Sequence, residues 1–227
     1  RCGEAMTDLV IFDCDGVLID SEIISARMLV DELAALGVGI DLAYVARHFL
    51  GRSYPVVMEQ IRREFGLDLP GDFEDRYRAR LLAAFERDLR IMPGVALVLE
   101  RMALPFCVAT SSSPRRVEMS LRLVGLWHLC GPRLFNATMV ARGKPAPDLF
   151  LHAAREMGVA PGRCLVIEDS LTGIRAARAA GMEVWRFIGG SHMGPETPEE
   201  PEDARPDRRF SDFAGFFGLD PRIAARG

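Results

Sequence analysis

The sequence predicts an α/β fold, in which a doubly wound parallel sheet carries an inserted helical cap. Short apolar runs recur along the chain, and helical patterns separate them. Continuous apolar runs of four or so residues are typical of parallel strands that are covered on both faces. A long stretch without any strand follows the first run, which indicates an insertion. The apolar runs occupy residues 9–12, 106–109, 164–167 and 184–187.

Amphipathic patterns predict the helices. In the core we expect helices at residues 115–124 and 148–157, and another that ends near residue 180. In the inserted stretch we expect helices at residues 23–36, 42–49, 56–65 and 73–87, with glycine and proline residues between them. The predicted division is therefore an α/β core of residues 1–18 and 91–227 with a helical cap of residues 19–90. Residues 189–206 are rich in Gly, Pro and Glu, and we expect a solvated loop there.

Composition excludes several classes of protein. The 227 residues are 49% hydrophobic and 26% charged, which is ordinary for a soluble globular protein. A net charge of −4 gives no basic face for nucleic acid. No stretch approaches the roughly 18–20 apolar residues of a membrane span. We therefore expect neither a nucleic-acid partner nor a membrane partner.

Cysteine usage and the N-terminus favour a reduced, cytoplasmic protein. The five cysteines form no CxxC pair, and their number is odd. Cys107 and Cys164 fall inside predicted strands, where a free cysteine acts as a small apolar side chain. Residues 1–5 lack the long apolar segment of a secretory signal.

Two carboxylates directly follow the first predicted strand, in Asp13-Cys14-Asp15-Gly16. Open α/β sheets bind their ligands at the carboxyl ends of their strands. Burying two carboxylates close together is unfavourable unless something offsets their charge, and a divalent cation is the simplest candidate. A plain Asp-Gly turn after a strand is the structural alternative.

Hydroxyl groups follow the second run, in Thr110-Ser111-Ser112-Ser113. Hydroxyls and backbone N–H groups at the start of a helix can bind an anion. Pro114 fits the first helical turn, and Ser113 is the predicted N-cap. Runs of serine before a helix are also common as simple caps.

Lys144 is the single lysine among 28 positively charged residues. Because arginine serves everywhere else, this position indicates a need for a compact point charge rather than a planar fork. Chance is the alternative explanation. Flanking prolines restrict its loop, which makes Lys144 a candidate to hold a phosphoryl group.

A third acidic site follows the run at residues 164–167. Glu168 and Asp169 lie at the carboxyl end of this predicted strand, where they can meet Asp13 and Asp15 around one hard cation such as Mg²⁺. Asp169 or Ser170 can also cap the helix that follows, but capping leaves Glu168 unexplained.

The sequence resembles the haloacid dehalogenase superfamily, and the likeness extends over residues 9–187. Within it, the beta-phosphoglucomutase-like phosphatases and mutases are the most similar branch. The resemblance implies a Rossmann-like core with a helical cap. The motifs that carry it occur in the family's order: Asp13-Cys14-Asp15-Gly16-Val17-Leu18, Thr110, Lys144-Pro145 and Glu168-Asp169.

The resemblance also implies a reaction. Asp13 attacks phosphorus to form an aspartyl-phosphate, and Asp15 acts as general acid and then as general base. Mg²⁺ is expected at Asp13, the backbone carbonyl of Asp15 and Asp169, with help from Glu168. The expected phosphate-binding groups are Lys144, Thr110, Ser111 and neighbouring N–H groups.

Several alternatives remain. Dehalogenation needs neither the metal nor Asp15, and a phosphonatase needs a cap lysine that this chain lacks. A non-catalytic phospho-accepting regulatory domain uses similar residues, but it is about half as long and has no cap. A purely structural or partner-binding protein would not hydrolyse phosphate esters.

The alternative nearest in chemistry is a phosphosugar mutase. In beta-phosphoglucomutases a histidine lies twelve residues after the nucleophile, and here that position is Ser25. The arginine expected after the Gly-x-Ser turn is also absent, because Tyr54 follows Ser53. Arg52 lies two positions earlier and is a tentative contact for an anionic or hydroxylated substrate tail. We therefore expect a phosphatase that acts on a small phosphorylated sugar or sugar acid, as a monomer or weak homodimer.

Overall fold

A computed structural model describes residues 6–194 and 200–223. Residues 1–5, on which the expected absence of a secretory signal depends, lie outside the described residues. Among the helices that are described, none has the length and apolar character needed to cross a lipid bilayer.

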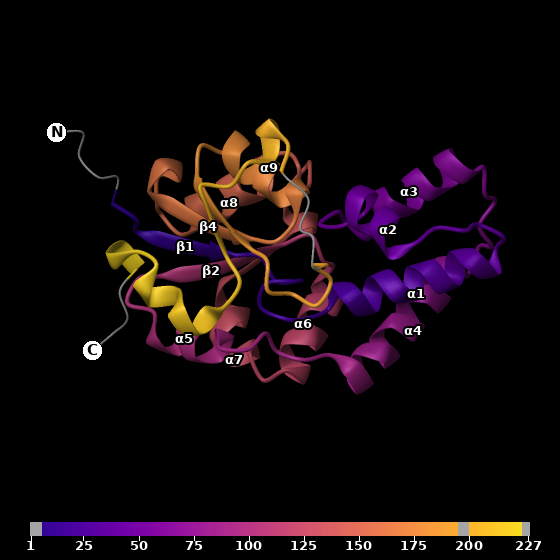
Figure 1. The fold of residues 1–227 in the computed structure, drawn as a ribbon, viewed down its shortest axis with the longest axis horizontal. Coiled ribbons are helices and arrows are strands. Elements are labelled where there is room, and N and C mark those ends of the chain that lie inside the picture. The colour runs from indigo at the N-terminus through magenta and orange to yellow at the C-terminus, as the bar shows by residue number, and fades with distance from the viewer. Residues whose placement is uncertain (1–5, 195–199, 224–227) are drawn as a thin grey trace.

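The core is a parallel sheet in the order β3-β2-β1-β4-β5-β6 (Figure 1). This confirms the predicted α/β class and the four predicted strands. Two further strands at the sheet edges were not predicted. They have only three residues each, and one of them begins with two exposed arginines. The strands are β1 (Leu9–Phe12), β2 (Phe106–Thr110), β3 (Leu134–Asn136), β4 (Cys164–Glu168), β5 (Glu183–Phe187) and β6 (Arg208–Phe210).

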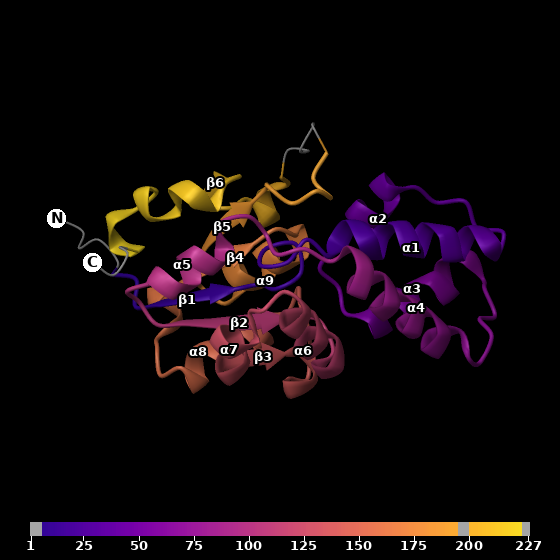
Figure 2. The same cartoon turned by 90° about the horizontal axis from the view of Figure 1, so that it is seen from below.

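Strand register brings the candidate site residues to one edge. The last residue of β1, Phe12, pairs with Val108 on β2 and with Ile167 on β4. The residues that follow on each strand therefore emerge together at the carboxyl end of the sheet. This edge faces the helical segment described below (Figure 2).

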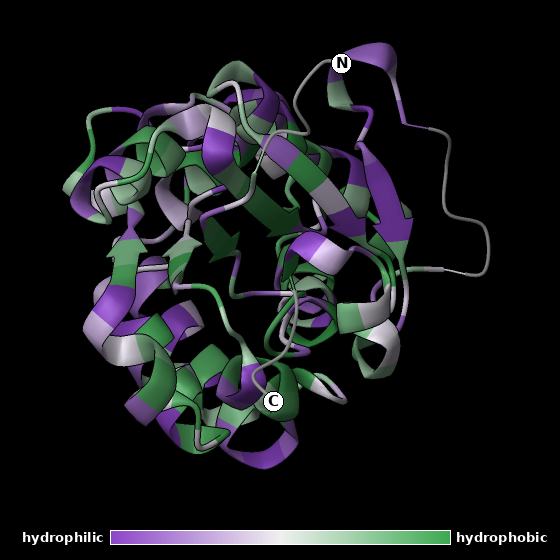
Figure 3. Cartoon of the chain, turned by 90° about the vertical axis from the view of Figure 1, so that its left-hand side faces the viewer, coloured by the Kyte–Doolittle hydropathy of each residue, from purple (hydrophilic) through white to green (hydrophobic). Residues whose placement is uncertain are grey.

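Apolar side chains leave β1 alternately toward two separate cores. Leu9 and Ile11 pack in one buried cluster with α8 and α9, whereas Val10 and Phe12 pack in another on the opposite face. Figure 3 shows the hydrophobic strands, in green, with helices on either side of them. The sheet is therefore covered on both faces, as the continuous apolar runs predict. The core helices are α5 (Val95–Arg101), α6 (Pro114–Leu123), α7 (Trp127–Cys130), α8 (Asp148–Glu156) and α9 (Leu171–Ala179).

Four helices follow β1 and lie together beyond the carboxyl edge of the sheet (Figures 1 and 2). Their bounds match the predicted helices within two residues. Helix α1 packs against α2 and α4, and its buried Leu29 and Leu33 join the apolar cluster that contains Val10. The division of the chain into two domains stays a prediction. The helices are α1 (Glu22–Ala35), α2 (Leu42–His48), α3 (Tyr54–Phe65) and α4 (Phe73–Asp88).

The segment after β5 differs from the solvated loop expected at residues 189–206. Most of its described residues are exposed, but the side chains of His192 and Glu200 are only 5% and 1% exposed. Glu200 accepts a hydrogen bond from Arg186 on β5, and Ser191 donates its N–H to Asp20. Hydrogen bonds therefore join residues 189–206 to β5 and to Asp20, just before the first helix that follows β1.

Candidate active site

Lys144 joins two of the predicted carboxylates. Its ammonium lies 2.7 Å from Asp13 Oδ1 and 2.7 Å from Glu168 Oε1, and it donates a third hydrogen bond to the carbonyl of Ala109 at 3.1 Å. The Lys144 side chain is 1% exposed. All three N–H donors thus have acceptors, so the buried charge is paired as buried charges must be.

The predicted residues at the end of β4 and just after it have different roles. Ser170 is the N-cap of α9, and its hydroxyl accepts from the N–H of Gly173 at 3.0 Å. Glu168 Oε2 accepts from the N–H groups of Asp169 and Ser170, both at 2.9 Å. Capping therefore belongs to Ser170, whereas Glu168 both fixes this turn and holds Lys144.

The acidic group fits a hard cation. Asp13, Glu168 and Asp169 are buried, and each offers a carboxylate oxygen within 4.8 Å of the others. Among the described residues, none donates a hydrogen bond of good geometry to the buried Asp169 Oδ2, although His192 Nε2 lies 2.9 Å from it. A donor set made only of oxygens is the kind that Mg²⁺ prefers. Both oxygens of Glu168 already accept hydrogen bonds, so Asp13 and Asp169 retain more free acceptor capacity.

The charges of this group perturb one another. Burial raises the pKa of Asp13 well above its usual range, against the opposing charge of Lys144. Burial and the neighbouring Glu168 likewise raise the pKa of Asp169. Two carboxylates that resist ionisation together would be stabilised by a divalent cation.

Asp15 occupies a different environment from Asp13. Its Oδ1 accepts from Ser21 at 2.6 Å and from Arg116 at 2.9 Å, and its Oδ2 accepts from Ser112 at 2.6 Å. Burial would raise the pKa of Asp15, but Arg116 and the serine hydroxyls outweigh it and lower that pKa. Because its side-chain oxygens are engaged in this way, only the backbone of Asp15 remains a candidate metal ligand.

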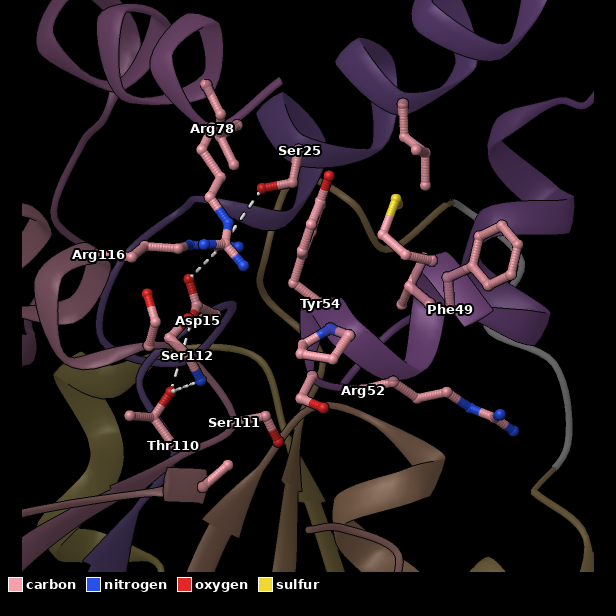
Figure 4. Close-up of a pocket in the computed structure, with 18 of the residues that line it drawn as sticks. Asp15, Ser25, Phe49, Arg52, Tyr54, Arg78, Thr110, Ser111, Ser112 and Arg116 are labelled. Carbon is pink, nitrogen blue, oxygen red and sulfur yellow. Dashed lines mark hydrogen bonds and ion pairs between the residues drawn. The ribbon is translucent and has the colours of Figure 1, made fainter. Parts of the chain in front are cut away.

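The hydroxyl run after β2 lies beside Asp15 (Figure 4). Thr110 Oγ1 lies 3.4 Å from Asp15 Oδ2 and accepts from the N–H of Ser112. Ser111 donates to the carbonyl of Gly51, in the helical segment. Ser113 occupies the N-cap of α6 as predicted, but its side chain makes no capping hydrogen bond.

A cavity of about 920 Å³ lies between this sheet edge and the helical segment. Asp13, Asp15 and Thr110 line its core side. Arg52 lines the cavity too, but its side chain is exposed, bonds to Gln60 and extends away from Asp15 in Figure 4. The opposite wall is mostly apolar and aromatic, and includes Leu29, Val45, Phe49, Tyr54, Val57, Met58, Tyr77 and Leu81.

Sequence reasoning missed Arg116 and His192. Arg116 is one arginine among many, and its place in the first turns of the helix after Ser113 was the only available signal. His192 lies in the segment expected to be solvated, yet its Nε2 is 2.9 Å from Asp169 Oδ2. A partner outside the ligand shell can orient a metal-binding carboxylate.

Comparison with known proteins agrees with this geometry. The family model of haloacid dehalogenase-like hydrolases matches residues 7–181. The 6-phosphogluconate phosphatase of Escherichia coli (strain K12) is 31% identical over 189 residues, 83% of this chain and 86% of the relative. Hexitol phosphatase B of the same strain is 30% identical over 177 residues, 76% of this chain and 79% of the relative. A crystal structure of a haloacid dehalogenase-like protein from Agrobacterium tumefaciens str. C58 has a TM-score of 0.80 and 37% identity, covering 94% of this chain and 97% of that chain.

The chain therefore belongs to the haloacid dehalogenase-like hydrolase family. Within that family it is a phosphoric monoester hydrolase, as its phosphatase relatives indicate. This confirms the resemblance inferred from the four motifs.

Proposed function

We propose that this phosphatase is Mg²⁺-dependent and hydrolyses a small phosphorylated sugar or sugar acid through an aspartyl-phosphate on Asp13. The observation that carries the proposal is the buried contact of Lys144 with Asp13 and Glu168, beside the carboxylate of Asp169, whose Oδ2 accepts no hydrogen bond from the described residues. Mg²⁺, held by Asp13, Asp169 and the Asp15 carbonyl, supplies positive charge that offsets the repulsion between carboxylate and phosphate.

In the first step, a carboxylate oxygen of Asp13 attacks phosphorus and the ester P–O bond breaks. Asp15 must enter this step protonated, against the effect of Arg116 on its pKa, and it gives that proton to the leaving alkoxide, so an alcohol departs. Thr110 and Ser111 hold the phosphoryl oxygens, and the positive charge of Lys144 beside Asp13 stabilises the negative charge that develops on them.

In the second step, water attacks the phosphorus of the aspartyl-phosphate. Asp15, now ionised, takes a proton from that water while the bond from phosphorus to Asp13 breaks. Inorganic phosphate leaves and both aspartates return to their starting forms. Asp13 contacts Lys144, whereas Asp15 contacts Ser112 and Arg116, so only Asp13 lies beside the cation expected at the phosphoryl group.

The cavity and the relatives support the proposed substrate class. A volume of about 920 Å³ suits a small metabolite. Two relatives, the 6-phosphogluconate phosphatase and hexitol phosphatase B, are named for a phosphorylated sugar acid and for hexitol phosphates. We assign the enzyme to the cytoplasm as a monomer or weak homodimer, with neither nucleic acid nor membrane as a partner.

A mutase is the alternative that shares this chemistry. It needs a group that shuttles protons beside Asp15, and at the expected position Ser25 instead accepts from Arg116 at 3.2 Å. A serine hydroxyl does not titrate near neutral pH, which favours water as the acceptor. A non-catalytic phospho-accepting domain is disfavoured by the six-stranded sheet with Asp13 after β1 and by the cavity.

The test is phosphate release from 6-phosphogluconate and sorbitol 6-phosphate. We expect turnover with Mg²⁺, none in excess chelator, and none in Asp13→Asn. Asp15→Asn should lose about 10²–10⁴-fold in kcat. Asp203→Asn, at an exposed residue paired with Arg175, is the matched control and should retain wild-type turnover.

Two results would contradict the proposal. One is wild-type turnover by Asp13→Asn or in excess chelator. The other is rapid conversion of beta-glucose 1-phosphate, with a trace of its bisphosphate, into glucose 6-phosphate with little free phosphate. That product would establish the mutase instead.

A further inference from the structure

Arg116 differs from the other cations that line the cavity. Four arginines of the described chain do so, and Arg52, Arg78 and Arg115 are exposed. The Arg116 side chain is only 22% exposed and extends from α6 toward Asp15 and Ser25 (Figure 4). It is therefore the cation that lies inside the cavity rather than at its rim.

Contacts from both sides of the cavity hold the Arg116 guanidinium in place. Its Nη2 donates to Asp15 at 2.9 Å and to Ser25 on α1 at 3.2 Å. Its central carbon lies 5.2 Å from the ring centre of Phe85 on α4, within the range of a cation–π contact. A guanidinium held in this way is oriented before any substrate enters.

The same guanidinium has donors to spare. Both of its hydrogen bonds come from Nη2, whereas Nε is buried and has no partner among the described residues. A buried N–H without an acceptor is unfavourable, and of the five N–H donors of this guanidinium only those of Nη2 bind acceptors within the described part of the protein. Because Arg116 lines the cavity, an acceptor on a bound substrate can pair with donors that the protein leaves free.

The position of Arg116 sets where that acceptor must lie on the substrate. The phosphoryl group belongs at Asp13 and Lys144, and Asp15 faces the leaving oxygen. Because Arg116 contacts Asp15, it lies on the leaving-group side, where the carbon skeleton of the substrate enters the cavity. The acceptor is therefore part of the alcohol that is released.

We propose that Arg116 is a specificity-determining residue that binds a carboxylate on the leaving group, so that the enzyme prefers phosphorylated acids to the matching alcohols. This inference rests on the proposed phosphatase function. A guanidinium fits a planar carboxylate better than a hydroxyl, because two N–H groups can bind its two oxygens. One guanidinium also matches a monoanion better than a second phosphate dianion.

Two substrate pairs test this, because the members of each pair differ only by COO⁻ in place of CH₂OH. They are 6-phosphogluconate with sorbitol 6-phosphate, and 3-phosphoglycerate with glycerol 3-phosphate. In the wild type we expect kcat/KM to favour the acid of at least one pair by about 10- to 100-fold, as for a hydrogen bond to a charged group. In Arg116→Met we expect that ratio to fall to about one.

The ratio separates recognition from a structural role. Arg116 could instead only position Asp15 or hold α1 and α4 against the core. In that case Arg116→Met lowers kcat/KM of acid and alcohol equally, and the acid-to-alcohol ratio of kcat/KM stays unchanged. Arg122→Gln, at an exposed position on the same helix paired with Glu118, should retain the wild-type ratio. An unchanged ratio in Arg116→Met, or a wild type without preference for either acid, would overturn the inference.

A binding measurement decides the inference even without turnover. In an Asp13→Asn background, calorimetry should show tighter binding of the preferred acid than of its alcohol, and Arg116→Met should remove the difference. If no phosphate ester is hydrolysed but this difference is present, the phosphatase mechanism fails and the role of Arg116 stands. Equal binding of acid and alcohol would refute that role.

Discussion

Gly51 and Ser170 are packed so closely that a Cβ atom on Gly51 would overlap the Ser170 hydroxyl. Gly51 belongs to the helical segment, whereas Ser170 caps α9 beside Asp169. Ser111 strengthens the same contact by donating to the Gly51 carbonyl at 3.0 Å. The helical segment thus closes on the sheet edge through a contact that has no room for a side chain.

Gly51→Ala should therefore impair catalysis more than it impairs stability. The added methyl group would hold the two halves apart, and a misplacement of about 1 Å can cost about 10²-fold in rate. Gly66→Ala is the matched control, since both glycines have positive φ, 74° and 63°, but Gly66 has open space around it. We expect similar losses of Tm in both variants and a large loss of kcat/KM in Gly51→Ala alone. Equal kcat/KM values in Gly51→Ala and Gly66→Ala would show that the close packing of Gly51 on Ser170 is unimportant for catalysis.

Lys144→Arg should lose activity, although arginine is the usual positively charged residue of this chain. The ammonium donates to three acceptors within 3.1 Å in a site where Lys144 is 1% exposed. A longer, planar guanidinium cannot meet the same three acceptors. We expect kcat/KM to fall by about 10²–10³-fold, as when a stabilising donor is removed.

The exposed pair of Arg142 with Asp148 supplies the control, Arg142→Lys, which should change little. Retention of most activity by Lys144→Arg would mean that the isolated lysine is an accident of composition.

The sequence predicts the elements whose burial is uniform and misses those whose burial is mixed. The strand ending at Phe12 is covered on both faces, so the sequence shows it as one uninterrupted apolar run. Strand β6 begins with exposed Arg208 and Arg209 and buries only Phe210, so it carries no such signal. Its place in the sheet depends on pairing with β5, which is a tertiary contact.

The candidate site divides in the same way. Asp13, Lys144 and Glu168 could be proposed because each follows a recognisable strand or stands out by residue type. Arg116 could not, since its role depends on where α6 points relative to the cavity. His192 lies in a segment of turn-forming composition, and only the tertiary structure brings it to Asp169.

Gly173→Ala should destabilise the protein, although alanine normally favours a helix by up to about 1 kcal/mol. Gly173 lies in the first turn of α9, where a Cβ atom would overlap the carboxylate of Glu168. That carboxylate binds Lys144 and the turn that precedes the helix, so it cannot move without breaking these contacts. We expect a loss of about 1–3 kcal/mol in the free energy of unfolding, as for other overpacked sites, together with a loss of kcat/KM. Urea unfolding and steady-state kinetics measure the two effects.

Gly162→Ala is the control, because Gly162 has open space around it and no positive φ. A Gly173→Ala variant as stable and as active as Gly162→Ala would show that Glu168 does not need to hold its position.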